Sequence, residues 1–191
     1  MIKYYLFKAS GPINVPEFKN GLDAIDEDYS LSLSSPDEGF FTASEKFAVR
    51  LQGVLFPLHD DLGITISVLA CHADGALERK SLKEALSYFP NQCLFLSDIL
   101  MKEFSFGDYS SLPLLKEEMK KVPHELLLTA GAFLRCGLNA SLAAESLFIH
   151  RNTFNYRLSQ FIDLTGLDIR DYHNALLLEI YFQLGESTKR W

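Results

Sequence analysis

The groups that could recognise another molecule are concentrated in one short segment, residues 150–157. This segment holds an imidazole, amides, hydroxyls and two guanidinium groups, and it contains no acidic residue. Amide and guanidinium groups bond base edges in the DNA major groove, and guanidinium groups also pair with phosphates. The candidate DNA-contacting residues are His150, Arg151, Asn152, Thr153, Asn155, Tyr156 and Arg157.

These residues lie within a stretch, 143–158, whose pattern is typical of a helix-turn-helix. The small Ala144 lets two helices cross closely, and Leu147 and Ile149 are placed to anchor the turn between them. Apolar residues recur at helical spacing along the second helix and predict its buried face: Phe154, Leu158 and Phe161. The opposite face then carries polar groups, which suits a helix that enters a major groove.

The helix-turn-helix belongs to a region, 124–191, that is predicted to be all helical. The predicted helices are His124–Cys136, Asn139–Leu147, about Arg151–Leu164 and about Tyr172–Leu184. Pro123 is expected in the first turn of the first helix, and Asp171 is expected to cap the last one. Gly137 and Gly166 are expected to end the first and third helices in the left-handed conformation.

The last predicted helix is apolar almost all round, which predicts burial on more than one side. Two interpretations fit this pattern. The helix packs within its own domain and against the N-terminal region, or one of its faces forms a homodimer contact. A dimer would supply the second recognition helix with which helix-turn-helix proteins bind paired half-sites.

Residues 124–184 closely resemble the C-terminal helix-turn-helix domain of PucR/CdaR-type bacterial transcriptional regulators. The resemblance is carried by LFIHRNT at 147–153, YRL at 156–158 and LTGLD at 164–168. The same segment is similar to the DNA-binding motif of the nucleoid protein Fis. The sequence departs from these motifs at Phe148, where many have Gly in the turn, and at Asn155, where a basic residue is frequent.

The resemblance implies that 151–162 is the recognition helix. By the same resemblance, Arg151 meets a phosphate or a guanine edge, while Arg157 and His150 reach phosphates. The remaining candidates, Asn152, Thr153, Asn155 and Tyr156, would then face bases or backbone.

Three of these residues allow a simpler interpretation. Arg157 could pair with a carboxylate such as Asp163 or Asp168. Tyr156 could be partly packed, and His150 could be a polar helix-end residue.

The N-terminal part, 1–106, is predicted to be a mixed α/β domain, joined by a linker helix over 107–123 to the helix-turn-helix domain, 124–191. The fold class is therefore α+β. The expected elements are strands at 3–7, 63–71 and 92–96, helices at 18–25 and 77–89, and a hairpin over 31–41. Residues 47–58 are rich in β-prone residues, so a strand is predicted there that Pro57 ends or places at a sheet edge. This domain is expected to sense a small-molecule effector or to mediate oligomerisation.

The charge of the chain is distributed unevenly. The 191 residues carry a net charge of −7, with 48% hydrophobic residues, which excludes a disordered chain. Residues 1–123 hold 12 basic and 18 acidic residues, whereas residues 124–191 hold 6 and 7. The acidity therefore lies mainly in the N-terminal part. The near-equal numbers of basic and acidic residues in 124–191 predict few phosphate contacts per subunit. Dimerisation would then be needed for stable binding to a DNA site.

Other kinds of site have little support in the sequence. The chain lacks GxxxxGK[ST], GxSxG and HExxH, so neither an enzyme nor a bound cofactor is predicted. Residues 59–61 (HDD) and 72–74 (HAD) contain metal-ligand types, but the strand between them separates them by roughly 30 Å. They are interpreted as polar loop ends, and no metal site is predicted. Cys71, Cys93 and Cys136 are expected to be buried, reduced thiols.

The sequence thus favours a cytoplasmic, sequence-specific regulator that binds double-stranded DNA as a homodimer. It shows no signal peptide and no apolar run long enough for a membrane helix. The alternative is a protein-interaction regulatory module whose helix-turn-helix no longer binds DNA. The net acidic charge, Phe148 and Asn155 favour that alternative.

Overall fold

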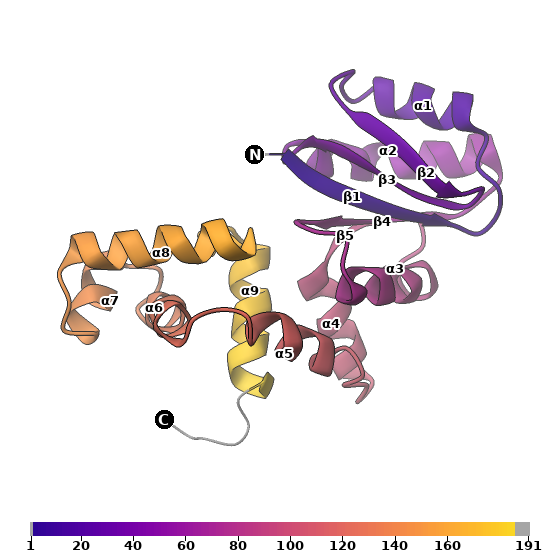
Figure 1. The fold of residues 1–191 in the computed structure, drawn as a ribbon. Coiled ribbons are helices and arrows are strands. Elements are labelled where there is room, and N and C mark those ends of the chain that lie inside the picture. The colour runs from indigo at the N-terminus through magenta and orange to yellow at the C-terminus, as the bar shows by residue number, and fades with distance from the viewer. Residues whose placement is uncertain (1, 186–191) are drawn as a thin grey trace. The chain divides into compact units, whose positions relative to one another are not determined.

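A five-stranded sheet organises the N-terminal part of the computed structural model, which describes residues 2–185 (Figure 1). The strands are β1 (Ile2–Ala9), β2 (Ser30–Ser35), β3 (Glu38–Ser44), β4 (Ile66–Cys71) and β5 (Cys93–Phe95), in the order β2-β3-β1-β4-β5. β1 pairs antiparallel with both β3 and β4, so Leu6 lies between Phe40 and Leu69. The predicted hairpin is confirmed as β2–β3, and the strands predicted at 63–71 and 92–96 are found as β4 and β5, which pair in parallel.

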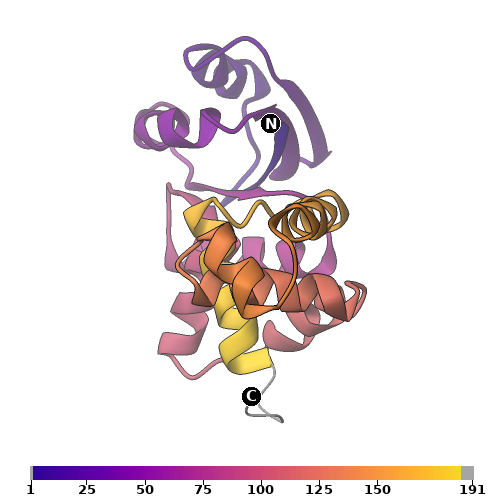
Figure 2. The same ribbon diagram turned by 90° about the vertical axis from the view of Figure 1, so that its left-hand side faces the viewer.

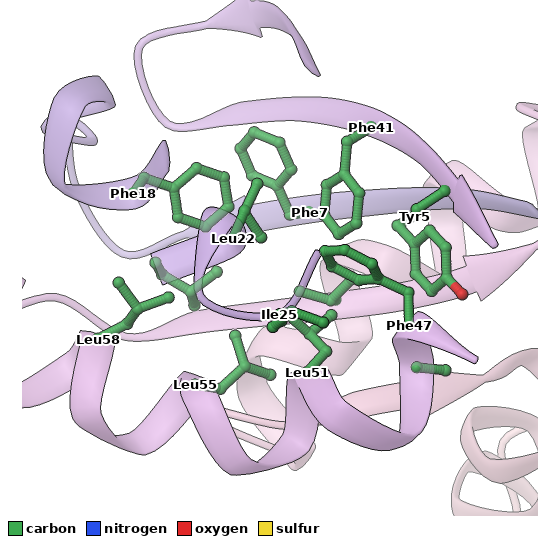
Figure 3. Packing of buried hydrophobic residues seen from close by; sticks show 14 of the residues in the cluster. Tyr5, Phe7, Phe18, Leu22, Ile25, Phe41, Phe47, Leu51, Leu55 and Leu58 are labelled. Carbon is green, nitrogen blue, oxygen red and sulfur yellow. The ribbon is translucent and has the colours of Figure 1, made fainter. Parts of the chain in front are cut away.

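The helices of this part are α1 (Val15–Asp23), α2 (Phe47–Leu62), α3 (Ala76–Tyr88) and α4 (Leu96–Ser105). Alternate side chains of β1 and β3 point toward α1 and α2 and form an aromatic core with them (Figure 3). Within this core, the rings of Tyr5 and Phe41 stack with centroids 4.9 Å apart, and Phe7 contacts Phe18. Helices α1 and α2 therefore cover one face of the sheet.

The predicted strand over 47–58 is wrong, because these residues form the helix α2. Phe47, Leu51, Leu55 and Leu58 are all buried, and their spacing of three or four residues marks one helical face. Pro57 lies inside the helix on its exposed side. A proline is tolerated there because helices can bend with the convex side toward water. The helix α4 was not predicted.

The C-terminal part contains α5 (Leu112–Met119), α6 (His124–Arg135), α7 (Ala140–Ser146), α8 (Arg151–Thr165) and α9 (Tyr172–Ile180), followed by a π-helical turn (Tyr181–Gly185). The α+β fold class is confirmed. Gly137 and Gly166 have the predicted positive φ angles, and Asp171 caps α9 as predicted. Pro123 occupies the N-cap of α6 rather than its first turn. The last helix gives way to the π turn at Tyr181.

The chain divides after Asp108 into two compact units, each with its own internal contacts. The linker helix predicted over 107–123 corresponds to α5, which lies in the second unit and contacts the π turn. α9 packs against α6, and its apolar residues Leu177, Leu178 and Ile180 are buried. The apolar character of this helix is thus explained in part by packing inside the second unit.

The structure also places the cysteines and the His/Asp segments. Cys71 is buried and burial raises the pKa of its thiol, whereas Cys93 and Cys136 are only half-buried. Residues 59–61 are the last turn of α2 rather than a loop. Among residues 2–185, no group of three or more potential ligands is arranged to hold a metal ion. None of the helices described is long and apolar enough to span a bilayer.

Candidate nucleic-acid interface

The helix-turn-helix consists of α7, the turn 147–150 and α8, as predicted (Figure 1). Ala143 and Ala144 of α7 are buried, which permits the close approach of α7 to α8. On α8, Phe154, Leu158 and Phe161 form the buried face, and the ring of Phe154 contacts Phe133 of α6 at 5.9 Å. The buried face of the second helix is therefore the one that the sequence predicted.

The turn is fixed by hydrogen bonds at the end of α7. The amide of Ile149 donates to the carbonyl of Ala144, and the amide of Phe148 donates to the carbonyl of Glu145, each at 3.0 Å. This pair of bonds is a Schellman motif, which needs a left-handed residue after the helix. Phe148 supplies it, with φ of 54°.

His150 caps the N-terminus of α8. Its Nδ1 atom accepts a hydrogen bond from the amide of Asn152 at 3.1 Å, so one of the unpaired amides at the start of the helix is satisfied. This bond requires an unprotonated Nδ1, which leaves Nε2 as the proton-carrying nitrogen of the neutral ring. The interpretation of His150 as a polar helix-end residue is confirmed in this form.

The N-terminal half of α8 presents its polar groups to solvent. Five of the seven predicted DNA-contacting residues are exposed side chains of this helix: Arg151, Asn152, Thr153, Asn155 and Tyr156. The first turn of α8 contains no acidic residue. The structure thus brings these residues together on one accessible surface, and their contact with DNA stays a prediction.

Tyr156 is not packed into the core, since 63% of its surface is exposed. Its hydroxyl accepts a hydrogen bond from Nε2 of Gln160 at 3.0 Å, one turn further along α8. Gln160 extends the polar surface beyond the predicted residues. The spacing of four residues is the signal by which the sequence could have linked the two.

Arg157 differs from the other candidates. Its guanidinium Nη2 lies 3.1 Å from Oε2 of Glu125 on α6, and its side chain is only 29% exposed. The interpretation that Arg157 pairs with a carboxylate is confirmed, but the partner is Glu125 and not Asp163 or Asp168. Glu125 was missed because it lies on another helix, and no local spacing connects the two residues.

Residues 126–184 match the family model described as the PucR C-terminal helix-turn-helix domain. Over 104 residues the chain is 32% identical to the carbohydrate diacid regulator of Escherichia coli, covering 51% of this chain and 27% of that protein. It is 35% identical over 97 residues to the proline-responsive transcriptional activator PutR of Bacillus subtilis, covering 50% and 23%. The chain therefore spans about a quarter of the length of these two regulators.

Two further similarities extend over more of the chain. An uncharacterized protein of Mycobacterium tuberculosis is 24% identical over 185 residues, covering 94% of this chain and 45% of that protein. A solved structure, the regulator of polyketide synthase expression from Bifidobacterium adolescentis, covers all of this chain and 83% of its own, with a TM-score of 0.49 and 17% identity. The motif at 147–158, its helix-turn-helix geometry and the family match agree: residues 126–184 form a PucR C-terminal helix-turn-helix domain.

Proposed function

We propose that this protein is a transcriptional regulator that binds double-stranded DNA sequence-specifically, with α8 in the major groove. The observation that carries the proposal is the group of exposed amide, hydroxyl and guanidinium side chains on the N-terminal half of α8. Asn side chains suit adenine edges, and an Arg suits guanine or a phosphate. The named relatives are regulators, and this supports regulation without catalysis as the role of the chain.

The charge at the start of α8 supports an anionic partner. The N-terminus of a helix carries a partial positive charge, and Arg151 adds a full one at the first helical position. No acidic side chain lies in the first turn to offset it. A phosphate or an electronegative base edge would relieve this accumulation of positive charge.

We propose a homodimer in the cytoplasm as the binding form. One subunit exposes few cations on α8, since Arg157 is engaged with Glu125. Each phosphate contact contributes separately to affinity, so one copy of α8 would bind weakly. Two copies on half-sites one DNA turn apart would provide the remaining affinity.

The N-terminal unit is proposed to sense a small-molecule effector or to mediate oligomerisation. A groove of about 510 Å³ lies between α1 and α2, within the size range of small-molecule sites. Its walls combine the small and apolar Gly21, Val54 and Leu58 with the carboxylates of Glu17 and Asp61. This mixture would favour a ligand that has an apolar body and a cationic or hydrogen-donating group.

The proposal is tested by selecting DNA fragments with the purified protein and measuring their affinities across a salt series. Arg151→Ala is expected to weaken binding roughly tenfold and to lower the slope of log K against log salt by about 1 if Arg151 contacts a phosphate. Asn152→Ala is expected to weaken binding roughly tenfold and to relax base preference with little change in slope. Arg170→Ala is the matched control, because it removes an exposed arginine outside α8 that pairs with Asp168. Unchanged affinity in both α8 variants would exclude this docking model.

The second candidate is a protein-interaction module. The acidic net charge of the chain favours it. It predicts that the folded protein shows no salt-dependent DNA binding even at low ionic strength. Enrichment of specific DNA fragments by the folded protein would reject it.

A further inference from the structure

Phe148 occupies an unfavourable position in two independent respects. Its side chain is 97% exposed, so the ring gains almost nothing from burial. Its backbone has φ of 54°, in the left-handed region where a side chain other than that of Gly, Asn or Asp is uncommon. Neither feature helps the isolated chain to fold.

The same capping motif occurs at the end of α6, with the expected residue. There the amide of Gly137 donates to the carbonyl of Leu134, and the amide of Leu138 donates to the carbonyl of Phe133. Gly137 holds the left-handed position with φ of 60°, which costs a glycine no strain, and the next residue, Leu138, is left-handed as well with φ of 61°. The turn after α7 would be made equally well by glycine, so the geometry of the turn does not explain the phenylalanine.

The position of Phe148 associates it with the start of α8. It lies two residues before the cap His150 and three before Arg151, the first residue of the helix. The exposed residues that follow Phe148 at the start of α8, 150–153, all carry hydrogen-bonding or cationic side chains. A lone ring beside such groups suits DNA, where sugars and thymine methyl groups lie between phosphates and polar base edges.

We propose that Phe148 is a DNA-contacting residue whose ring packs against deoxyribose or thymine methyl groups next to the N-terminus of α8. This inference rests on the proposed function, since it requires α8 to bind DNA. The contact would contribute affinity without displacing counterions, because the ring is uncharged. Phe148 would therefore strengthen binding in a chain whose recognition helix has few free cations.

The test compares four variants of the 191-residue chain on a duplex selected by the wild-type protein from a random-sequence pool. Phe148→Ala removes the ring and keeps the left-handed strain, while Phe148→Gly removes both. Phe148→Trp keeps an aromatic ring. Leu164→Ala is the control, because Leu164 is an exposed apolar residue at the other end of α8, about 20 Å along the helix axis.

Both Phe148→Ala and Phe148→Gly are expected to weaken DNA binding about tenfold at every salt concentration, with the salt slope unchanged. Phe148→Gly is expected to raise the midpoint of thermal unfolding by about 2–4 °C, and Phe148→Ala to leave it nearly unchanged. Phe148→Trp and Leu164→Ala are expected to bind as the wild type does. Phe148→Gly is then more stable than the wild type and Phe148→Ala is not. Equal losses of DNA affinity in the two variants would show that the loss comes from the missing ring and not from a change in stability.

Duplexes in which single thymines are replaced by uracil identify the surface that the ring touches. If the ring contacts a thymine methyl group, one replacement weakens the wild type but not Phe148→Ala; if it contacts only deoxyribose, no replacement does. Affinities of both ring-deleted variants within twofold of a DNA-binding wild type would overturn the inference, as would a change in oligomeric state that accounts for the loss. A folded wild type that selects no DNA would instead reject the proposed function.

Discussion

Nη2 of Arg157 lies 3.1 Å from Oε2 of Glu125, so the middle of α8 is joined to the first turn of α6. The pair is partly exposed, with 29% of the arginine side chain and 59% of the glutamate side chain accessible. An ion pair of this kind contributes little to stability. In the proposed complex with DNA its consequence would be greater, because a phosphate would compete with Glu125 for the same guanidinium.

Glu125→Gln is therefore expected to strengthen DNA binding several-fold at low salt and to steepen the salt slope by up to about 1. The free energy of unfolding should change by less than about 1 kcal/mol. Both quantities can be measured by fluorescence anisotropy and urea unfolding of the full chain. Glu117→Gln is the matched control, because Glu117 of α5 pairs with Lys120, just past the end of that helix, and the substitution makes the same change in charge. Equal effects of the two substitutions would mean that only net charge matters.

The cap at the start of α8 gives a second prediction. His150→Ala removes the acceptor for the amide of Asn152 and should lower the free energy of unfolding by about 1 kcal/mol. His150→Asn retains an acceptor at a favoured cap residue and should preserve stability. Urea unfolding measures both. Equal stability of the two variants would show that the His150 bond contributes nothing.

Two glycines of the N-terminal unit give a third prediction. A Cβ atom at Gly21 of α1 would lie 2.6 Å from Cδ2 of the buried Leu58, whereas a Cβ at Gly53 of α2 would meet nothing within 4 Å. Gly21→Ala is expected to destabilise by about 1–2 kcal/mol through overpacking. Gly53→Ala is expected to stabilise by about 0.5–1 kcal/mol through helix propensity. A stabilised Gly21→Ala variant in thermal or urea unfolding would show that α1 and α2 separate easily.

The fourth prediction concerns pH. A hydrogen bond from Ser35 at 2.6 Å, followed by one from Lys8 at 2.9 Å, holds the pKa of Asp37 below its ordinary value. Because the folded-state pKa is lowered, the stabilisation is fully present above the unfolded value of about 4 and is lost as the pH falls through the lower folded-state pKa. Urea unfolding between pH 7 and pH 3 should show a smaller acid-induced loss in Asp37→Asn than in the wild type. Identical pH profiles would contradict this role of Asp37.

Local patterns in the sequence were sufficient for most of the second unit. Helical periodicity identified the buried face of α8, and Gly137, Gly166 and Asp171 marked helix ends by their own conformational and capping preferences. These signals act within a few residues, so they can be found without a tertiary structure. The match at 126–184 then confirmed the domain that the motif had indicated.

Local patterns were not sufficient where the decisive contacts are distant. Residues 47–58 have β-prone composition, but the helix α2 buries Phe47, Leu51 and Leu55 against the aromatic side chains of the sheet. Burial of a whole face outweighs intrinsic propensity, which is weak. The sequence contained this periodicity, but only the sheet beneath it determined that a helix forms there.

By itself, the sequence determined the helix-turn-helix, the residues that α8 presents to solvent and the uneven distribution of charge. The tertiary structure alone decided that Arg157 is bound by Glu125 and that the ring of Phe148 is left in solvent. The reason is physical. Spacing along a helix fixes which side chains it presents to solvent, whereas an ion-pair partner on another helix and the exposure of a residue in a turn depend on how the helices pack together.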